Sequence, residues 1–180
     1  YIGAGAVAAG GIISLIKSAP LIVSTFKQAM GSMAKNHANA DAPRTQRDLP
    51  MPVILGIVVV IALAIWLLPI FPVSPLGAII VVVFGFFFAT VSSRMVGLIG
   101  SSNNPVSGMA IATLIIATLL LKATGTTGTS GMIGAICIGS IICIVAAIAG
   151  DTSQDLKTGF IVGATPKLQQ IGEMIGVIAS

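Results

Sequence analysis

Two short polar motifs interrupt an otherwise apolar chain, and they hold most of the residues that could bind a ligand or carry a proton. The first motif runs from Gly100 to Gly108 and the second from Gly150 to Gly159. The candidate site residues are Asn103, Asn104, Pro105 and Ser107 in the first motif, and Asp151, Gln154, Asp155 and Lys157 in the second. Amide and hydroxyl groups can hydrogen-bond a substrate, whereas carboxylates can accept and release protons. Both motifs are therefore candidates for a substrate or ion pathway.

The first motif predicts an interruption of helical structure over residues 100–108. Pro105 cannot donate a backbone hydrogen bond, and Gly100 and Gly108 weaken a helix on either side of it. At membrane depth such a break persists only where protein or a watery cavity satisfies the freed backbone groups. In transporters, broken helices of this kind form substrate and ion sites. The alternative is an ordinary polar turn between two helices.

The second motif predicts a helix that begins at Asp151. Gln154 follows three residues later, which is the spacing of a capping box. Asp151 and Asp155 would then lie on one face of the helix, with Lys157 nearby. Because Asp151 would be occupied as the cap, Asp155 is the better candidate for a carboxylate that couples transport to protons. Two alternatives are a purely structural capped helix and an integral membrane enzyme that uses both aspartates.

Two further ionisable residues lie beside or within apolar segments. Glu173 stands between Gly172 and Gly176, a spacing typical of close helix packing. Arg94 follows a long uncharged stretch and can extend its side chain to the membrane surface. Either charge would cost about 2.5–3.5 kcal/mol at the membrane centre. Glu173 is therefore included among the candidate pathway residues.

The composition indicates the elements that must position these residues. Apolar residues make up 56% of the chain and charged residues 8%, and the mean hydropathy is +1.07. Water-soluble domains contain about 25% charged residues. The stretches 52–93, 95–121 and 123–150 contain no ionisable side chain. Since a membrane-spanning helix needs about 20 mostly apolar residues, the sequence predicts an integral membrane protein.

The fold class expected from these stretches is an all-α polytopic transmembrane bundle of about five to six spans. A transmembrane barrel is excluded because no ten-residue alternation of apolar and polar residues occurs. Residues 1–180 are expected to form one transmembrane region, a fragment of a larger transporter whose remaining spans are its partners. The predicted full spans are Val53–Leu68, Leu76–Ser93, Met109–Leu121 and Met132–Ala149, with partial spans at Tyr1–Ile16 and from within Phe160–Leu168.

Lysine and arginine are distributed unequally between the two predicted sides of the membrane. If the spans alternate, Lys122 lies on one side and the other eight of the 9 basic residues lie on the opposite side. Basic residues mark the cytoplasmic side, so the polar loop 34–50 is predicted to be cytoplasmic. Because the basic residues flank spans, the sequence predicts lipid and not nucleic acid as a partner. No nucleotide, haem or metal motif is present, and neither a cofactor nor a metal site is predicted.

The two motifs also carry a family resemblance. Asn104-Pro105-Val106-Ser107-Gly108-Met109 and the run from Gly150 to Gly159 resemble the oligopeptide transporter (OPT) family, as does the Gly/Ala-rich start of the chain, which resembles its prokaryotic members. The second motif is also similar to the Gly-Asp-x-x-Gln-Asp-x-Lys-Thr-Gly pattern of the yellow-stripe-like branch, which carries metal chelates.

The resemblance implies a secondary transporter in the cell membrane and not an enzyme. Its expected action is proton-coupled uptake of small peptides, and the alternative substrates are peptide-like metal chelates. The resemblance does not decide between these two substrates.

Overall fold

The computed structural model describes residues 43–68, 73–101 and 104–180, together with scattered positions between residues 2 and 27. Within these residues the regular structure is helical and contains no strand, which confirms the all-α prediction. The elements are the 3-10 helix η1 (Arg44–Gln46) and the α-helices α2 (Met51–Leu67), α3 (Pro75–Ile99), α4 (Val106–Ala123), α5 (Gly128–Val162) and α6 (Pro166–Ala179). Asn103 and most of the loop 34–50 lie outside the described residues.

Four segments of the described chain are long and apolar enough to cross a membrane. They are Arg44–Leu67, Pro75–Ile99, Val106–Ala123 and Gly128–Val162. All four predicted full spans are therefore present, although each begins earlier than predicted and three of them, α3, α4 and α5, also end later. The final predicted span corresponds to α6, which begins within the expected window but has only 14 residues. The partial span expected at the start of the chain lies where only scattered positions are described.

Helix α3 is longer than predicted because its ends are determined by capping residues and not by the position of Arg94. At its start, the Ser74 Oγ atom accepts a hydrogen bond from the Gly77 amide at 3.2 Å. At its end, Gly100 has a φ of 77°, and its amide donates to the Val96 carbonyl at 2.7 Å. A left-handed residue of this kind ends helices and favours glycine. The predicted end at Ser93 was therefore wrong by about one and a half turns.

Helix α5 is also longer than predicted, and it includes the whole acidic motif. It has 35 residues and is therefore about 52 Å long, well beyond a hydrocarbon core of about 30 Å. The prediction ended this span at Ala149 and began a new helix at Asp151, which is wrong. No residue between them breaks the helix, and Gly163, with a φ of 73°, provides the end.

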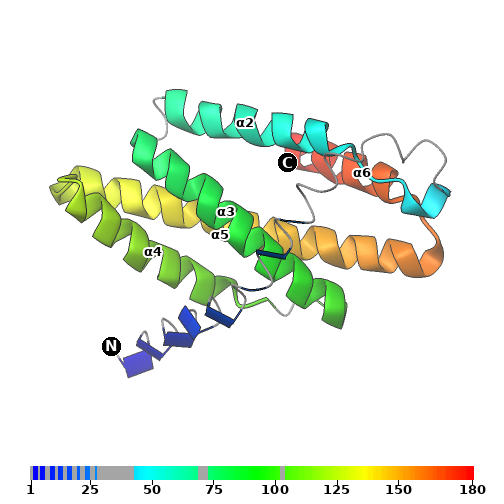
Figure 1. Ribbon diagram of the computed structural model, residues 1–180, viewed down its shortest axis with the longest axis horizontal. Coiled ribbons are helices and arrows are strands. Elements are labelled where there is room, and N and C mark those ends of the chain that lie inside the picture. Colours follow the sequence, from blue (N-terminus) through cyan, green and yellow to red (C-terminus); the bar gives the residue numbers. More distant parts are fainter. Residues whose placement is uncertain are drawn as a thin grey trace.

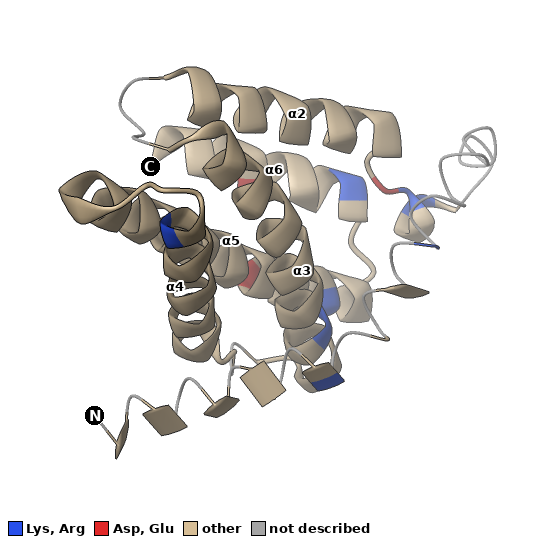
Figure 2. Ribbon diagram, turned by 60° about the vertical axis from the view of Figure 1, so that its left-hand side comes forward, with Lys and Arg blue, Asp and Glu red and all other residues tan. Residues whose placement is uncertain are grey.

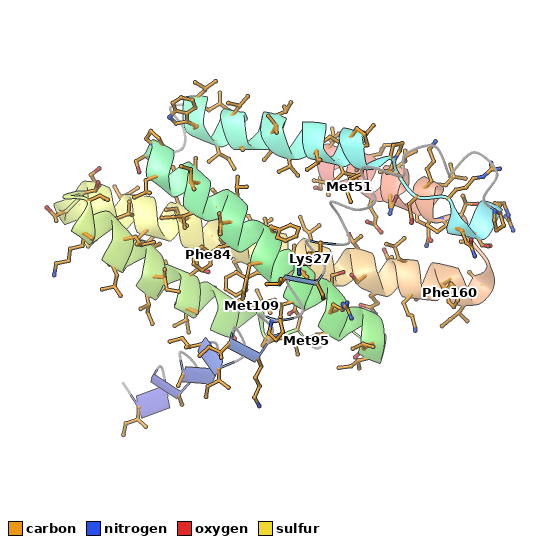
Figure 3. The ribbon with its side chains drawn as sticks, viewed as in Figure 1. Lys27, Met51, Phe84, Met95, Met109 and Phe160 are labelled. Carbon is orange, nitrogen blue, oxygen red and sulfur yellow. The ribbon has the colours of Figure 1, made fainter. Side chains whose placement is uncertain are left out.

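The core lies where α3 and α4 pack against α5 (Figure 1). The largest completely buried apolar side chains in it are Phe88, Val96, Ile138 and Ile142. Figure 3 shows Phe84, Met95 and Met109 in the region where α3 and α4 approach one another, whereas Phe160 extends away from the other helices. Helix α2 is different, since only 6% of its apolar window is buried. Exposed apolar faces are expected where lipid is the solvent.

The described basic residues are distributed unequally between the two ends of the bundle (Figure 2). The start of α2, the ends of α3 and α5 and the start of α6 lie at one end of the bundle, whereas the α4–α5 turn lies at the other (Figure 1). Lys122 is close to that turn, and Arg44, Arg47, Lys157 and Lys167 are at the first end. Two hydrogen bonds support this grouping: Arg44 donates to the Gly163 carbonyl at 3.2 Å, and the Lys167 amide donates to the Arg47 carbonyl at 2.9 Å.

Candidate functional site

The polar interruption after α3 separates two helices that run in opposite directions (Figure 1). Helix α3 ends at Ile99 and α4 begins at Val106, so the interruption is shorter than the expected 100–108. Ser107 and Gly108 lie in the first turn of α4, where Ser107 is exposed. The expected break at 100–108 thus lies between two spans and not within one.

This connection nevertheless turns back into the bundle. The Asn104 Nδ2 atom donates to the Ser92 Oγ atom and to the Ala146 carbonyl at 2.9 Å. Ser92 also donates to the Ala146 carbonyl, at 2.6 Å, and is completely buried. Ser92 precedes the end of α3 by seven residues, or about 10 Å. Asn104 therefore ties α3 and α5 together well inside the helix ends.

The orientation of the Asn104 amide follows from its neighbours. The Ala146 carbonyl can only accept, so the amide atom next to it must be the nitrogen. The Asn104 Oδ1 atom is then left buried without a hydrogen-bond partner among the described residues. An unpaired buried acceptor is costly, which makes this oxygen a point where a donor from the rest of the protein or from a ligand would be favourable.

Gly150, the first residue of the acidic motif, packs directly against the Asn104 network. A Cβ atom at this position would lie 3.0 Å from Asn104 Nδ2 and 3.2 Å from Ser92 Oγ. A larger residue here would crowd both polar groups, so the glycine favours this close approach of α5. The two motifs, which are more than 40 residues apart in sequence, are therefore in contact. Ser92 is not among the predicted site residues, because it lies within the predicted apolar span Leu76–Ser93.

The acidic motif lies inside α5, so the predicted capping box does not form. Asp151 and Asp155 do lie on one face, as predicted, since both line the same groove. Gln154 and Lys157 do not line this groove. Lys157 follows Asp155 by two residues, which turns it about 200° around the helix, and it is exposed. Lys157 is therefore close to the two aspartates in sequence but lies outside their groove.

The groove that contains Asp151 and Asp155 is formed by α5 and α6 and has a volume of about 260 Å³. Glu173 of α6 lines it as well, so three predicted pathway carboxylates converge here. One carboxylate oxygen of Glu173, Oε1, is buried and has no hydrogen-bond partner among the described residues. No lysine or arginine lines the groove. In the described chain, no group of three His, Cys, Asp or Glu side chains is arranged to hold a metal ion.

Helix α6 is attached to α5 through a second close contact. The Gln169 Nε2 atom donates to the Asp155 carbonyl at 3.1 Å. Gly159 leaves room for that side chain, because a Cβ atom there would lie 2.0 Å from the Gln169 Oε1 atom. On its other side, α6 accepts a hydrogen bond from the Leu49 amide through the Gln170 Oε1 atom, at 3.0 Å. A few polar contacts therefore hold α6, and this helix contributes Glu173 to the groove.

The arrangement has a definite chemical character. Carboxylates that lie inside a membrane are costly and typically mark ion and proton pathways. Without a neighbouring cationic side chain, the three carboxylates can accept protons or attract a cationic group of a substrate. The contact between Asn104 and Gly150 fixes the position of α5 next to them. The site thus combines a rigid element with a groove of negative charge.

Comparison with known proteins agrees with this description. A family model described as OPT oligopeptide transporter protein matches residues 1–180. A curated protein from Haemophilus influenzae, named "Putative oligopeptide transporter", is 30% identical over 199 residues. This alignment covers 98% of the present chain and 31% of the relative, so the chain spans about a third of that protein's length. No solved structure matches the chain. The chain is therefore an integral membrane protein that belongs to the OPT family of oligopeptide transporters.

Proposed function

We propose that this chain is part of a secondary transporter that takes up small peptides together with protons. Membership of the OPT family and the name of the Haemophilus influenzae relative support peptide transport and make an enzyme that uses Asp151 and Asp155 a poorer explanation. The observation that carries proton coupling is the groove between α5 and α6. Asp151, Asp155 and Glu173 line it, and no basic side chain does.

Proton coupling requires a carboxylate whose charge changes as access alternates between the two sides of the membrane. Burial makes the charged form unfavourable, and exposure to water restores it. Movement of α6 relative to α5 would produce such a change for residues in the groove. Asp155 remains the best candidate, for a new reason: its carbonyl accepts the hydrogen bond from Gln169 of α6. Asp151 does not cap a helix, because it lies inside α5.

The test is uptake by the full-length protein in proteoliposomes with an imposed proton gradient. Asp155→Asn removes the proton-accepting group but keeps the size of the side chain. This variant is expected to lose gradient-driven accumulation of a labelled peptide and to retain exchange of labelled for unlabelled peptide. Asp48→Asn is the matched control, since Asp48 is exposed and does not line the groove. Accumulation by Asp155→Asn with an unchanged pH profile would remove Asp155 from the coupling step.

The same assay addresses the alternative substrate. The resemblance of the second motif to the yellow-stripe-like pattern makes peptide-like metal chelates the competing class. Labelled peptide and labelled chelate should be compared under one gradient and at one concentration. Accumulation of the chelate but not of the peptide would replace the first substrate class with the second.

The orientation of the chain is also part of the proposal: loop 34–50 faces the cytoplasm. The unequal distribution of lysine and arginine supports this direction. On a background without other cysteines, which requires replacement of Cys137 and Cys143, Asn39→Cys should resist a membrane-impermeant thiol reagent in intact cells. Thr127→Cys, in the turn on the other side of the membrane, should react readily. The opposite labelling pattern would reverse the orientation.

A further inference from the structure

A second groove lies on the neighbouring face of α5, between α5 and α3, and it differs in charge from the first. Its volume is about 600 Å³, within the range usual for small-molecule sites. Arg94 is the one ionisable residue that lines it, and the side chains of Phe86, Leu98 and Leu156 supply apolar walls. No carboxylate lines this groove. The two grooves flanking α5 therefore have opposite charge.

Arg94 is available to bind an anion. It is exposed and makes no ion pair within the residues that the structure describes. A guanidinium group presents a planar set of donors that matches a carboxylate with two parallel hydrogen bonds. In a groove with apolar walls such a pair is stronger than in open water. The ligand expected here is thus a small molecule with a carboxylate.

Hydroxyl groups add a second donor. Ser93 of α3 and Ser153 of α5 share a hydrogen bond of 2.5 Å across the groove. Two hydroxyls carry two protons, and their mutual bond uses one of them. The other proton can be donated to a ligand. Thr90 is not equivalent, because its hydroxyl already donates to the Phe86 carbonyl at 2.8 Å.

The position of this groove next to the acidic one suggests the kind of molecule that fits. Thr152 lines both grooves and forms the ridge between them. A short peptide with free ends carries a carboxylate at one end and an ammonium group at the other. Charge complementarity of this kind determines specificity and orientation. The cationic groove fits the first group, and the acidic groove attracts the second.

We propose that the groove between α3 and α5 binds the C-terminal carboxylate of a peptide substrate, with Arg94 and the Ser93–Ser153 pair as donors. This proposal rests on the proposed function, peptide uptake. It assigns to Arg94 a role different from extension to the membrane surface, and it predicts that the transporter distinguishes peptides by their C-terminal group.

The experiment compares a dipeptide with its C-terminal amide in initial uptake by the full-length protein in proteoliposomes. The wild type should prefer the free acid by about tenfold or more, as expected for loss of a charge-assisted hydrogen-bond pair. Arg94→Gln should lose this preference, mainly through slower uptake of the acid. Arg94→Lys should keep part of it, since the charge remains but the paired geometry does not. Lys122→Gln, which changes a basic residue outside the groove, should keep the full preference.

The preference of each protein is its initial rate of uptake of the free acid divided by that of the amide. The decisive quantity is the preference of the wild type divided by the preference of the variant. The amide carries one more positive charge than the free acid, so the gradient acts differently on the two substrates. The wild type and the variant experience the same gradient, and this effect therefore cancels when their preferences are compared. A folded Arg94→Gln protein with the wild-type preference would overturn the proposal. If that variant does not fold, an undiminished preference in Arg94→Lys would overturn it.

Two other results are distinguishable. If the wild type takes up acid and amide equally, this inference fails and the proposed peptide transport stands; if it takes up neither, both fail. If Arg94→Gln changes only the dependence of uptake on the anionic lipid content of the vesicles, Arg94 binds a lipid phosphate, and the proposal is wrong.

Discussion

Toward α3 and α4, helix α5 buries Ile138, Ile142 and Ala146 completely, whereas toward α6 it presents the exposed residues Asp151 and Asp155. The first interface is closely packed and is reinforced by the buried hydrogen bonds of Ser92 and Asn104. The second is an open groove joined by the Gln169–Asp155 contact. Close-packed interfaces resist small displacements, whereas a few exposed hydrogen bonds do not. The difference indicates that α3, α4 and α5 form a rigid unit against which α6 can move.

The largest loss of stability should come from a cavity created in the rigid unit. Phe88→Ala removes a side chain that is 0% exposed, and it is expected to destabilise the protein by about 3 kcal/mol. This is the low end for such changes in water-soluble cores, because lipid and not water is the alternative environment of the ring. The unfolding midpoint of the full-length protein in detergent measures it.

Phe160→Ala is the matched control, since Phe160 is 75% exposed on the same bundle. Its unfolding midpoint should stay close to that of the wild type. Equal shifts for the two variants would contradict the division into a packed and an open region.

A smaller effect is expected at the polar part of the rigid unit. Asn104→Ala removes two hydrogen bonds but also an unpaired buried oxygen, so the net loss of stability should be about 1–2 kcal/mol. Uptake should fall more than expression does, because α5 is then less firmly positioned beside the acidic groove. Wild-type uptake by a normally expressed Asn104→Ala protein would reduce the connection to a plain turn without a functional role.

The membrane spans could be predicted from the sequence because they depend on local composition. Long uncharged stretches can exist only as helices in lipid, so each predicted full span was found. The helix ends were less predictable, since Gly100 and Gly163 determine them and charged residues such as Arg94 do not. The Asp151–Gln154 spacing gave a wrong helix start, because the same two residues can stand inside a continuous helix. Periodicity could place Asp151 and Asp155 on one face, but it could not show what that face contacts.

The arrangement of the site depends on contacts that no local pattern contains. Asn104 meets Gly150 only because α3 and α4 both pack on α5 in one particular register. Glu173 joins the two aspartates because α6 turns back along α5, and Gly159 allows this by leaving room for Gln169. Each of these residues was noticeable as polar or small in an apolar chain. Their pairing follows from tertiary packing.

The smallest effect on stability, and the sharpest test of the comparison, concerns the contact that joins the rigid unit to α6. Gln169→Ala removes one hydrogen bond at the margin of the bundle, and the expected loss of stability is about 1 kcal/mol or less. Gly159 would then face an open space, which neither clashes nor adds an unpaired group. If α6 moves during transport, this variant should change the rate of uptake, since Gln169 holds α6 to the segment that carries Asp155. Exchange and net uptake should be measured side by side with the unfolding midpoint. A changed transport rate at an unchanged midpoint is the expected result, because the contact then controls movement and contributes little to folding. An unchanged rate, or a loss of stability as large as that of Phe88→Ala, would show that α6 belongs to the rigid unit.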